Sequence, residues 1–219
     1  MKKLLLSIVF SVLYVSSASA ELGVNAGVSG NAGLFAGSAS EKYTNGQTNN
    51  GTEHGSAGWA SVFVEKTLGD VLLVGIDYVP GALETDTTET SKSDKRTAGT
   101  ETVTTGTNKV QVDFEDLTTV YVGARIGENF YAKVGVTNVS VVTNESLNTG
   151  GAYGNTDLDG VTFGVGYNHT TDSGAFVRVE GSYIQFDGST LTNTADSEKS
   201  IQLKNLDGVA GKISVGKSF

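Results

Sequence analysis

Apolar residues alternate with small or polar residues along most of the chain. From Leu22 to Gly37 the even positions are aliphatic or glycine, whereas the odd positions include Asn25, Ser29 and Asn31. A period of two is the signature of a strand with two different faces. No run of 18 apolar residues follows Ala20, so the pattern does not predict membrane-spanning helices.

The same alternation recurs in seven further segments. These are 59–66, 71–80, 118–127, 130–136, 160–168, 175–183 and 209–219. In the first of them we expect Ala60 and Val62 to point outward and Phe63 and Glu65 inward, although one bulge would reverse this facing. The pattern predicts an all-β fold, a closed antiparallel up-and-down transmembrane β-barrel of about eight strands.

The predicted connections alternate between short and long. The short links are 67–70, 127–129 and 170–174, and the long polar links are 39–56, 81–108, 143–157 and 187–200. Tight periplasmic turns and extended outer loops are typical of outer-membrane barrels, and they place both termini on the periplasmic side.

The first twenty residues have the features of a secretory signal peptide. Lys2 and Lys3 precede a mostly apolar run, and Ala18-Ser19-Ala20 forms a small-x-small cleavage pattern. We therefore expect residues 1–20 to be removed during Sec export and residues 21–219 to form the barrel. The mature chain would keep 13 basic and 24 acidic residues, a net charge of −11, which argues against nucleic acid as a partner.

Composition agrees with this reading. Glycine is frequent, with 29 residues, and cysteine is absent, so disulfides cannot hold a secreted domain together. A closed barrel in a membrane can, because each backbone group pairs across strands.

The signal peptide, the meander of eight strands and the C-terminal GKISVGKSF together resemble the small Gram-negative outer-membrane barrels. That family includes the OmpA-type transmembrane domain, OmpX, OmpW and the opacity proteins. The resemblance implies that Phe219 belongs to the signal read by the barrel-assembly machinery. Lys217 departs from the family pattern, in which an apolar or aromatic residue is more usual at that position.

Aromatic residues fall near both ends of the predicted strands, as in the girdles of membrane barrels. We expect Phe130, Tyr167 and Phe219 at the periplasmic ends. The predicted outer girdle consists of Tyr78, Phe114 and Tyr183.

Charged residues occur on the faces predicted to point inward. They are Glu65, Asp77, Arg125, Lys133, Arg178, Glu180 and Lys212. Because an isolated buried charge is costly, these groups must pair or meet water, and a barrel of eight strands is only wide enough for its side chains. We predict a salt-bridge network that plugs the lumen, whereas inward glycines such as Gly75 and Gly166 would leave space for a narrow pore.

The sequence indicates no catalytic, metal or cofactor site, so we do not expect an enzyme. The only histidines, His54 and His169, fall at opposite ends of the predicted barrel, and no Ser–His–Asp or Cys–His constellation is indicated. The acidic residues of the loops lack the spacing of a calcium-binding motif.

Three functions remain open at this point. The first is a structural or surface-interaction role in the outer membrane, through long acidic extracellular loops. The second is a narrow, porin-like channel for small solutes, and the third is a soluble lipocalin-like periplasmic binder. For the first two we expect a monomer surrounded by outer-membrane lipid and lipopolysaccharide, with an extracellular partner that the sequence does not identify.

Overall fold

Eight antiparallel strands form a closed ring in a computed structural model that describes residues 23–95 and 102–219. The ring order is β1-β2-β3-β6-β7-β8-β9-β11, and β11 returns to pair with β1. The ring strands are β1 (Val24–Lys42), β2 (Thr48–Leu68), β3 (Leu72–Tyr78), β6 (Val103–Ile126), β7 (Phe130–Ser146), β8 (Thr156–Thr170), β9 (Ala175–Phe186) and β11 (Ser200–Ser218). The all-β barrel predicted from the alternation is confirmed. The predicted signal peptide lies outside the described residues.

Three short strands extend the ring at one end. β4 (Leu83–Glu84) and β5 (Thr88–Lys95) pair with β6, and β10 (Ser189–Thr192) pairs with β11. Within the described ranges, no helix is long and apolar enough to cross a membrane.

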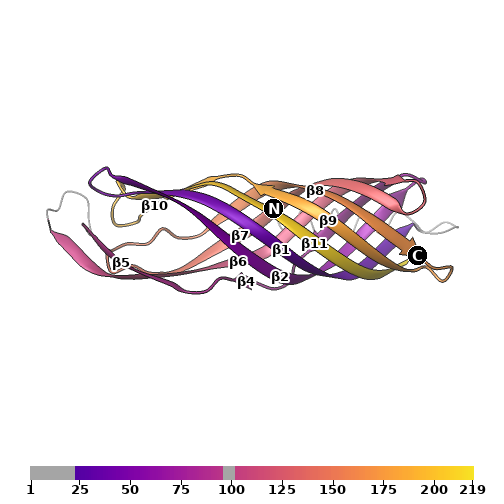
Figure 1. The fold of residues 1–219 in the computed structure, drawn as a ribbon, viewed down its shortest axis with the longest axis horizontal. Helices are drawn as coiled ribbons and strands as arrows, with labels where there is room; N and C mark the ends of the chain where they lie inside the picture. The colour runs from indigo at the N-terminus through magenta and orange to yellow at the C-terminus, as the bar shows by residue number, and fades with distance from the viewer. Residues whose placement is uncertain (1–22, 96–101) are drawn as a thin grey trace.

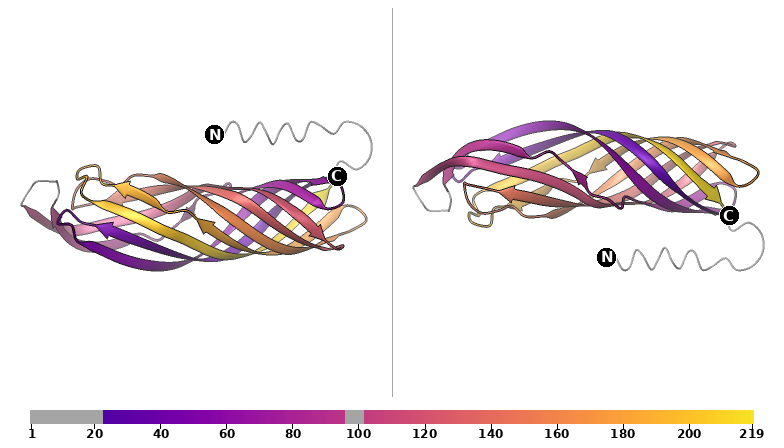
Figure 2. Two further views of the ribbon diagram at one scale, coloured as in Figure 1. Left: turned by 90° about the horizontal axis from the view of Figure 1, so that it is seen from above. Right: turned by 90° about the horizontal axis from the view of Figure 1, so that it is seen from below.

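The molecule is an elongated barrel with strongly tilted strands (Figure 1). Val24 and Phe219 exchange backbone hydrogen bonds of 3.3 and 2.8 Å, and we call the end where they lie the terminal end. β5 and β10 lie at the opposite end, which we call the distal end (Figure 1). Figure 2 shows the same elongated barrel from two further sides.

The strand faces follow the predicted alternation over the terminal half of the barrel. Asn25, Ser61 and Ser214 point inward and are buried, whereas the outward positions are aliphatic and exposed. Every ring strand carries at least one large exposed apolar residue, such as Val28, Val62, Leu72, Val122, Val136, Val165, Val179 and Ile213. The terminal half of the ring is therefore apolar outside and largely polar inside.

Two of the four segments predicted as long outer loops, 39–56 and 81–108, are largely strands in the described part of the chain, and the prediction was wrong for them, whereas 143–157 and 187–200 consist mostly of connections. β1 and β2 form a continuous ladder up to Lys42 and Thr48, so only residues 43–47 connect them. Residues 81–108 contain β4, β5 and the start of β6. Polar strands without an apolar face still gain backbone hydrogen bonds, and their sequences are difficult to distinguish from loops.

Two irregularities reverse the facing of strands near the distal end. The β6–β7 register shifts between Glu115 and Thr118, where Asp116 adopts a positive φ of 55°. A second shift occurs where Ser38 and Ala39 of β1 face Asn205 and Leu203 of β11. An extra residue in one strand exchanges its inner and outer faces.

The predicted outer girdle changes as a consequence of the first irregularity. Beyond it, the even positions of β6 point inward, so Phe114 packs against the barrel's apolar core. Its assignment to the outer girdle was therefore wrong.

The wall is incomplete at the distal end. β3 ends at Tyr78, and beyond it β4 and β5 take its place beside β6. Within the described part of the chain, the β2 segment from Thr48 to Ser61 has a ladder partner only on its β1 side. We call this interruption between β2 and β5 the seam.

Candidate functional site

A salt bridge crosses the lumen between β2 and β9. The Arg178 guanidinium donates to both Glu65 carboxylate oxygens, over 3.0 and 3.1 Å. Glu65 also accepts hydrogen bonds from the Asn25 amide at 2.8 Å and from the Tyr121 hydroxyl at 3.0 Å. Both charged side chains are almost completely buried, so each depends on the other for compensation.

Two further ion pairs lie next to the first, one step toward the distal end. Lys133 Nζ is 2.8 Å from Glu180 Oε1, and the Tyr131 hydroxyl donates to Glu180 Oε2 at 2.6 Å. Lys212 Nζ donates to Asp77 Oδ2 at 2.5 Å. We call these three ion pairs together the charged plug.

Aromatic rings occupy the space beside the inward glycines. A Cβ atom at Gly75 would lie 2.5 Å from the ring of Tyr121, its neighbour on β6. A Cβ atom at Gly166 would lie equally close to the ring of Tyr131 on β7. These glycines therefore make room for rings, and the suggestion that they leave space for a pore was wrong at these positions.

Little space remains around the plug. The cavity lined by Asp77, Lys133, Glu180 and Lys212 measures about 40 Å³, enough for a few water molecules at most. Toward the terminal end the lumen opens into a polar basin of about 810 Å³, bordered by Phe176 and Arg178. The basin and the distal part of the lumen are thus separated.

The structure places the remaining predicted residues as follows. Arg125 is exposed at the terminal end, where its guanidinium donates to Thr67 Oγ1 at 3.3 Å, so its assignment to the lumen network was wrong. Phe130 and Tyr167 lie on the outer surface with ring centroids 5.3 Å apart, and Phe219 is also exposed.

Two tyrosines of the predicted outer girdle bind carboxylates. The Tyr78 hydroxyl donates to Asp116 at 2.9 Å. The Tyr183 hydroxyl donates to Asp207 at 3.1 Å, and Tyr183 is exposed.

An apolar layer covers the distal side of the plug. Its buried centre consists of Val139, Leu158, Ile184 and Phe186. The residues that pack around this centre are Phe35, Phe114, Leu117, Val141, Leu203 and Leu206. The layer separates the plug from the space beyond it.

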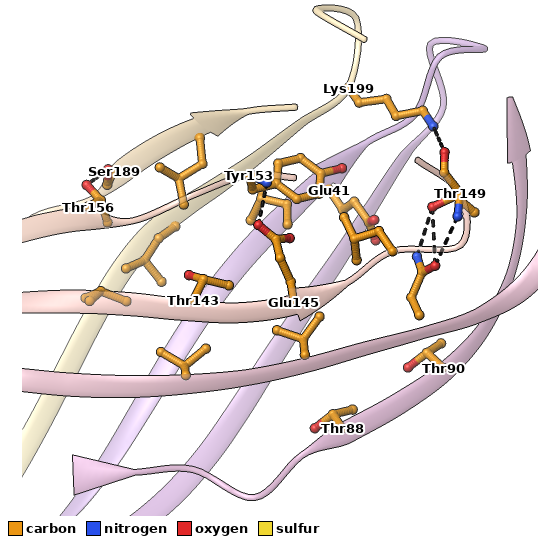
Figure 3. Close-up of a pocket in the computed structure, with 18 of the residues that line it drawn as sticks. Glu41, Thr88, Thr90, Thr143, Glu145, Thr149, Tyr153, Thr156, Ser189 and Lys199 are labelled. Atoms are coloured by element: carbon orange, nitrogen blue, oxygen red, sulfur yellow. Dashed lines mark hydrogen bonds between the residues drawn. The ribbon is translucent and has the colours of Figure 1, made fainter. Parts of the chain in front are cut away.

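A cavity of about 360 Å³ lies beyond the apolar layer, and we call it the outer cavity. Its inner part is lined mainly by aliphatic residues and Phe114. They are Val110, Val112, Phe114, Val141, Leu158, Leu191, Ile201, Leu203 and Leu206. Hydroxyl groups, among them those of Thr88, Thr143 and Tyr153, surround the rest (Figure 3). This volume lies in the lower part of the range of about 300–1,000 Å³ for ligand pockets.

The charged groups around the outer cavity already have partners. Lys92 forms a salt bridge with Glu41, and Lys199 Nζ lies 3.3 Å from Asp94 Oδ2. The Glu145 carboxylate accepts two backbone N–H groups, from Tyr153 at 2.6 Å and from Gly154 at 2.9 Å.

Tyr153 adds no charge of its own. Burial, reinforced by the nearby carboxylates of Glu41 and Glu145, raises the pKa of its hydroxyl, so the group is neutral near pH 7. The cavity therefore offers a ligand apolar surface and neutral hydroxyls, with no uncompensated charge among these groups.

No protein-family model matches the chain, and no curated protein matches its sequence. Its fold is similar to that of the outer membrane protein OprG from Pseudomonas aeruginosa. The TM-score is 0.55 and the identity 12%, over 91% of this chain and 97% of OprG. The chain has the fold of a bacterial outer-membrane β-barrel.

Two further outer-membrane barrels show weaker likeness. AlkL, solved in lipid bilayers, gives a TM-score of 0.49 at 15% identity, over 94% of this chain and 95% of AlkL. The outer membrane protease OmpT from Escherichia coli gives 0.45 at 9% identity, over 93% of this chain and 99% of OmpT.

The two histidines lie far apart on this outer-membrane barrel fold. His54 lies on the part of β2 that borders the seam, and His169 is the penultimate residue of β8, at the terminal end. Among the described residues, no group of His, Cys, Asp or Glu side chains could hold a metal ion.

The outer cavity was missed from the sequence because its polar residues lie mostly in segments taken for loops, and most of its apolar residues lie in stretches to which no strand was assigned. A signal was present in both walls of the cavity. Val110 and Val112 alternate with polar residues on β6, as Ile201 and Leu203 do on β11. On β5 the inward residues are all polar, so no apolar period indicated a strand there.

Proposed function

We propose that this chain is an outer-membrane protein of a Gram-negative bacterium, exported by the Sec pathway. The exposed aliphatic residues on all eight ring strands support this, since such a surface is stable in lipid and not in water. Both termini then face the periplasm, and the distal end projects outward. We further propose a monomer in contact with lipid and lipopolysaccharide, assembled by the barrel-assembly machinery.

The distribution of side chains is the opposite of what a soluble binder needs. A lipocalin-like protein would carry apolar residues inside and polar residues outside. Here Glu65 and Arg178 are buried in the lumen, whereas Val136 and Val165 are among the most exposed of the large apolar side chains.

The outer cavity suggests a specific kind of surface interaction, which is the binding of a small molecule. We propose that the cavity binds a small, uncharged and largely apolar molecule from outside the cell. The observation that carries this proposal is an apolar-lined cavity of about 360 Å³ above a closed plug. Apolar lining with a few polar groups is the usual composition of a small-molecule site.

Methyl NMR of the protein in lipid nanodiscs tests the binding proposal, with 1-octanol as an uncharged apolar probe. We expect octanol to shift the methyl signals of Val110, Leu158 and Leu203 in a saturable way. The outward methyls of Val134 and Val165 report partition of octanol into lipid. Equal, non-saturable shifts at both sets of methyls would contradict the proposal.

Filling the cavity provides a matched control. Leu203→Trp should abolish the saturable shifts, because the indole occupies the outer cavity. Val165→Trp, on the lipid-facing surface, should preserve them.

The channel hypothesis is tested by conductance across planar bilayers. The charged plug and the apolar layer support a closed barrel, so we expect little current from the native protein. Large, steady currents would favour the channel.

A further inference from the structure

One side of the outer cavity is closed by a strand that is joined to the barrel along a single edge. β5 pairs with β6 from Thr88 opposite Val110 to Lys95 opposite Val103. In the described part of the chain its other edge has no ladder partner, and it borders the seam. The β6–β7 ladder begins only at Lys109, opposite Ser146. We call β5 and residues 103–108 of β6 the arm.

The arm meets the rest of the barrel through polar groups alone on its inner face. The β5 residues that line the outer cavity are Thr88, Thr90, Lys92 and Asp94. None of these can add to the apolar layer. Polar contacts at an exposed end are the kind that water can replace, and such segments open at low free-energy cost.

Two ion pairs of opposite polarity hold the arm against the barrel. Lys92 of the arm binds Glu41 of β1, which lies beyond the seam and β2 in the ring, and the Tyr43 hydroxyl also donates to Glu41 at 3.1 Å. Asp94 of the arm binds Lys199, in the connection from β10 to β11. Lys199 Nζ donates in addition to the backbone carbonyl of Thr149 at 3.2 Å, so it also reaches the connection between β7 and β8 (Figure 3).

A third contact tethers the arm near its base. The Asn108 amide donates to Thr149 Oγ1 at 3.0 Å, and the Thr149 backbone N–H donates to Asn108 Oδ1 at 3.3 Å. The Asn148 amide also donates to the Thr105 backbone carbonyl at 3.5 Å. Among the described residues, the arm is thus held around the same cavity by polar contacts.

We propose that the arm is a movable flap over the outer cavity, and that Lys92–Glu41 and Asp94–Lys199 are its latches. The proposal rests on the proposed binding function: opening the latches admits the ligand, and closing them encloses it. The pairing is directional, since the arm supplies the cation of one latch and the anion of the other.

The absence of cysteine from the chain allows a direct test. A single thiol introduced by Leu203→Cys reports access to the cavity through its rate of reaction with an uncharged maleimide. Lys92→Glu places two carboxylates opposite each other and should speed labelling about tenfold, the factor that corresponds to about 1.4 kcal/mol. Adding Glu41→Lys restores the pair with exchanged charges and should return the rate to its original value.

A matched control lies on the outer face of the same arm. Glu89 of the arm binds Lys109, the first residue of β6 beyond the arm, and both side chains are more than half exposed. Lys109→Glu should leave the rate at Leu203→Cys unchanged, because this pair does not touch the cavity. A thiol at the exposed Thr190 should react at the same rate in every background.

Two results would overturn the flap. One is fast labelling of Leu203→Cys without any latch substitution, because the cavity would then be open already. The other is an unchanged labelling rate of Leu203→Cys when Lys92→Glu is added. If Lys92→Glu does not fold, Lys199→Met, which removes the other latch, replaces it in this test. Octanol binding without latch-dependent labelling would refute the flap and leave the binding function standing. Latch-dependent labelling without octanol binding would support a moving arm and refute the proposed binding function.

Discussion

Arg178 of β9 binds Glu65 of β2 across the lumen, although β11 and β1 lie between these two strands in the ring. The guanidinium also packs among the rings of Phe63, Tyr131 and Phe176, with its Cζ 4.8–5.4 Å from their centroids. The pair therefore links distant strands through a group that has lost most of its contact with water.

Removing one charge of this pair should be far worse than removing both. Arg178→Met leaves Glu65 buried without its cation, so we expect a loss of about 3–5 kcal/mol in the free energy of unfolding. Combining it with Glu65→Gln should recover much of this loss. Urea unfolding of the protein in lipid vesicles measures both, and equal losses in the single and double variants would contradict the interpretation.

The ion pairs of the charged plug should also control conductance. Arg178→Ala shortens the side chain that borders the terminal basin, so we expect bilayer currents above those of the native protein. Glu180→Ala removes the partner of Lys133 and should act in the same direction. Lys109→Ala, in an exposed ion pair at the base of the arm, is the control and should leave the current unchanged.

The inward glycines provide a test of packing in the lumen. Gly75→Ala would place a Cβ 2.5 Å from the Tyr121 ring, whose hydroxyl is fixed by Glu65. The ring cannot move away without breaking that hydrogen bond, so we expect a loss of about 1–3 kcal/mol. Gly181→Ala is the matched control, because no atom lies within 4 Å of its Cβ position. A similar stability for both variants, by urea unfolding, would show that the ring yields.

The sequence predicted the ring because each strand there has one apolar face for lipid and one polar face for the lumen. It predicted Glu65, Asp77, Lys133, Arg178, Glu180 and Lys212 as lumen residues, and the structure brings all six together in pairs. Arg125 obeys the same alternation but lies too near the strand end to reach them. Alternation predicts whether a side chain faces the lumen or the lipid, but it does not predict the position of that side chain along the barrel axis.

The distal end could not be predicted in this way, for two physical reasons. Irregularities near Asp116 and Lys204 exchange the faces of β6 and β11, and nothing in the local sequence marks them. Beyond the apolar band the outer faces of the strands meet water, so both faces can be polar, as on β5. The outer cavity depends on both features.

Phe219 allows a test of assembly. The resemblance to small outer-membrane barrels implies that this residue is read by the assembly machinery, so Phe219→Ala should lower the folded fraction in the outer membrane more than it lowers export. Phe130→Ala is the control, an exposed aromatic residue at the same end of the barrel. Fractionation and the heat-dependent gel mobility of folded barrels measure the two steps. Equal assembly of both variants would argue against a role for the terminal residue.

Replacing residues 81–108 with a tight turn separates the barrel from the cavity. The β3–β6 pairs, from Tyr78 opposite Thr118 to Leu72 opposite Ala124, lie outside this segment and survive. Lys109 lies nine residues beyond Thr118 on β6, so a tight turn after β3 draws residues 109–115 away from their partners on β7, while the β6–β7 pairs from Thr118 onward remain. A shorter connection costs no more closure entropy than a long one. We therefore expect a protein that still inserts into the membrane, as judged by flotation with lipid vesicles.

The same variant should lose the outer cavity. It lacks Thr88, Thr90, Lys92 and Asp94, which close the seam side, and it exposes Val110 and Val112 to water. Octanol should then no longer give saturable methyl shifts, although the plug should still block conductance. A variant that fails to insert would show that the segment is structural, whereas saturable octanol binding in an inserted variant would place the ligand elsewhere in the barrel.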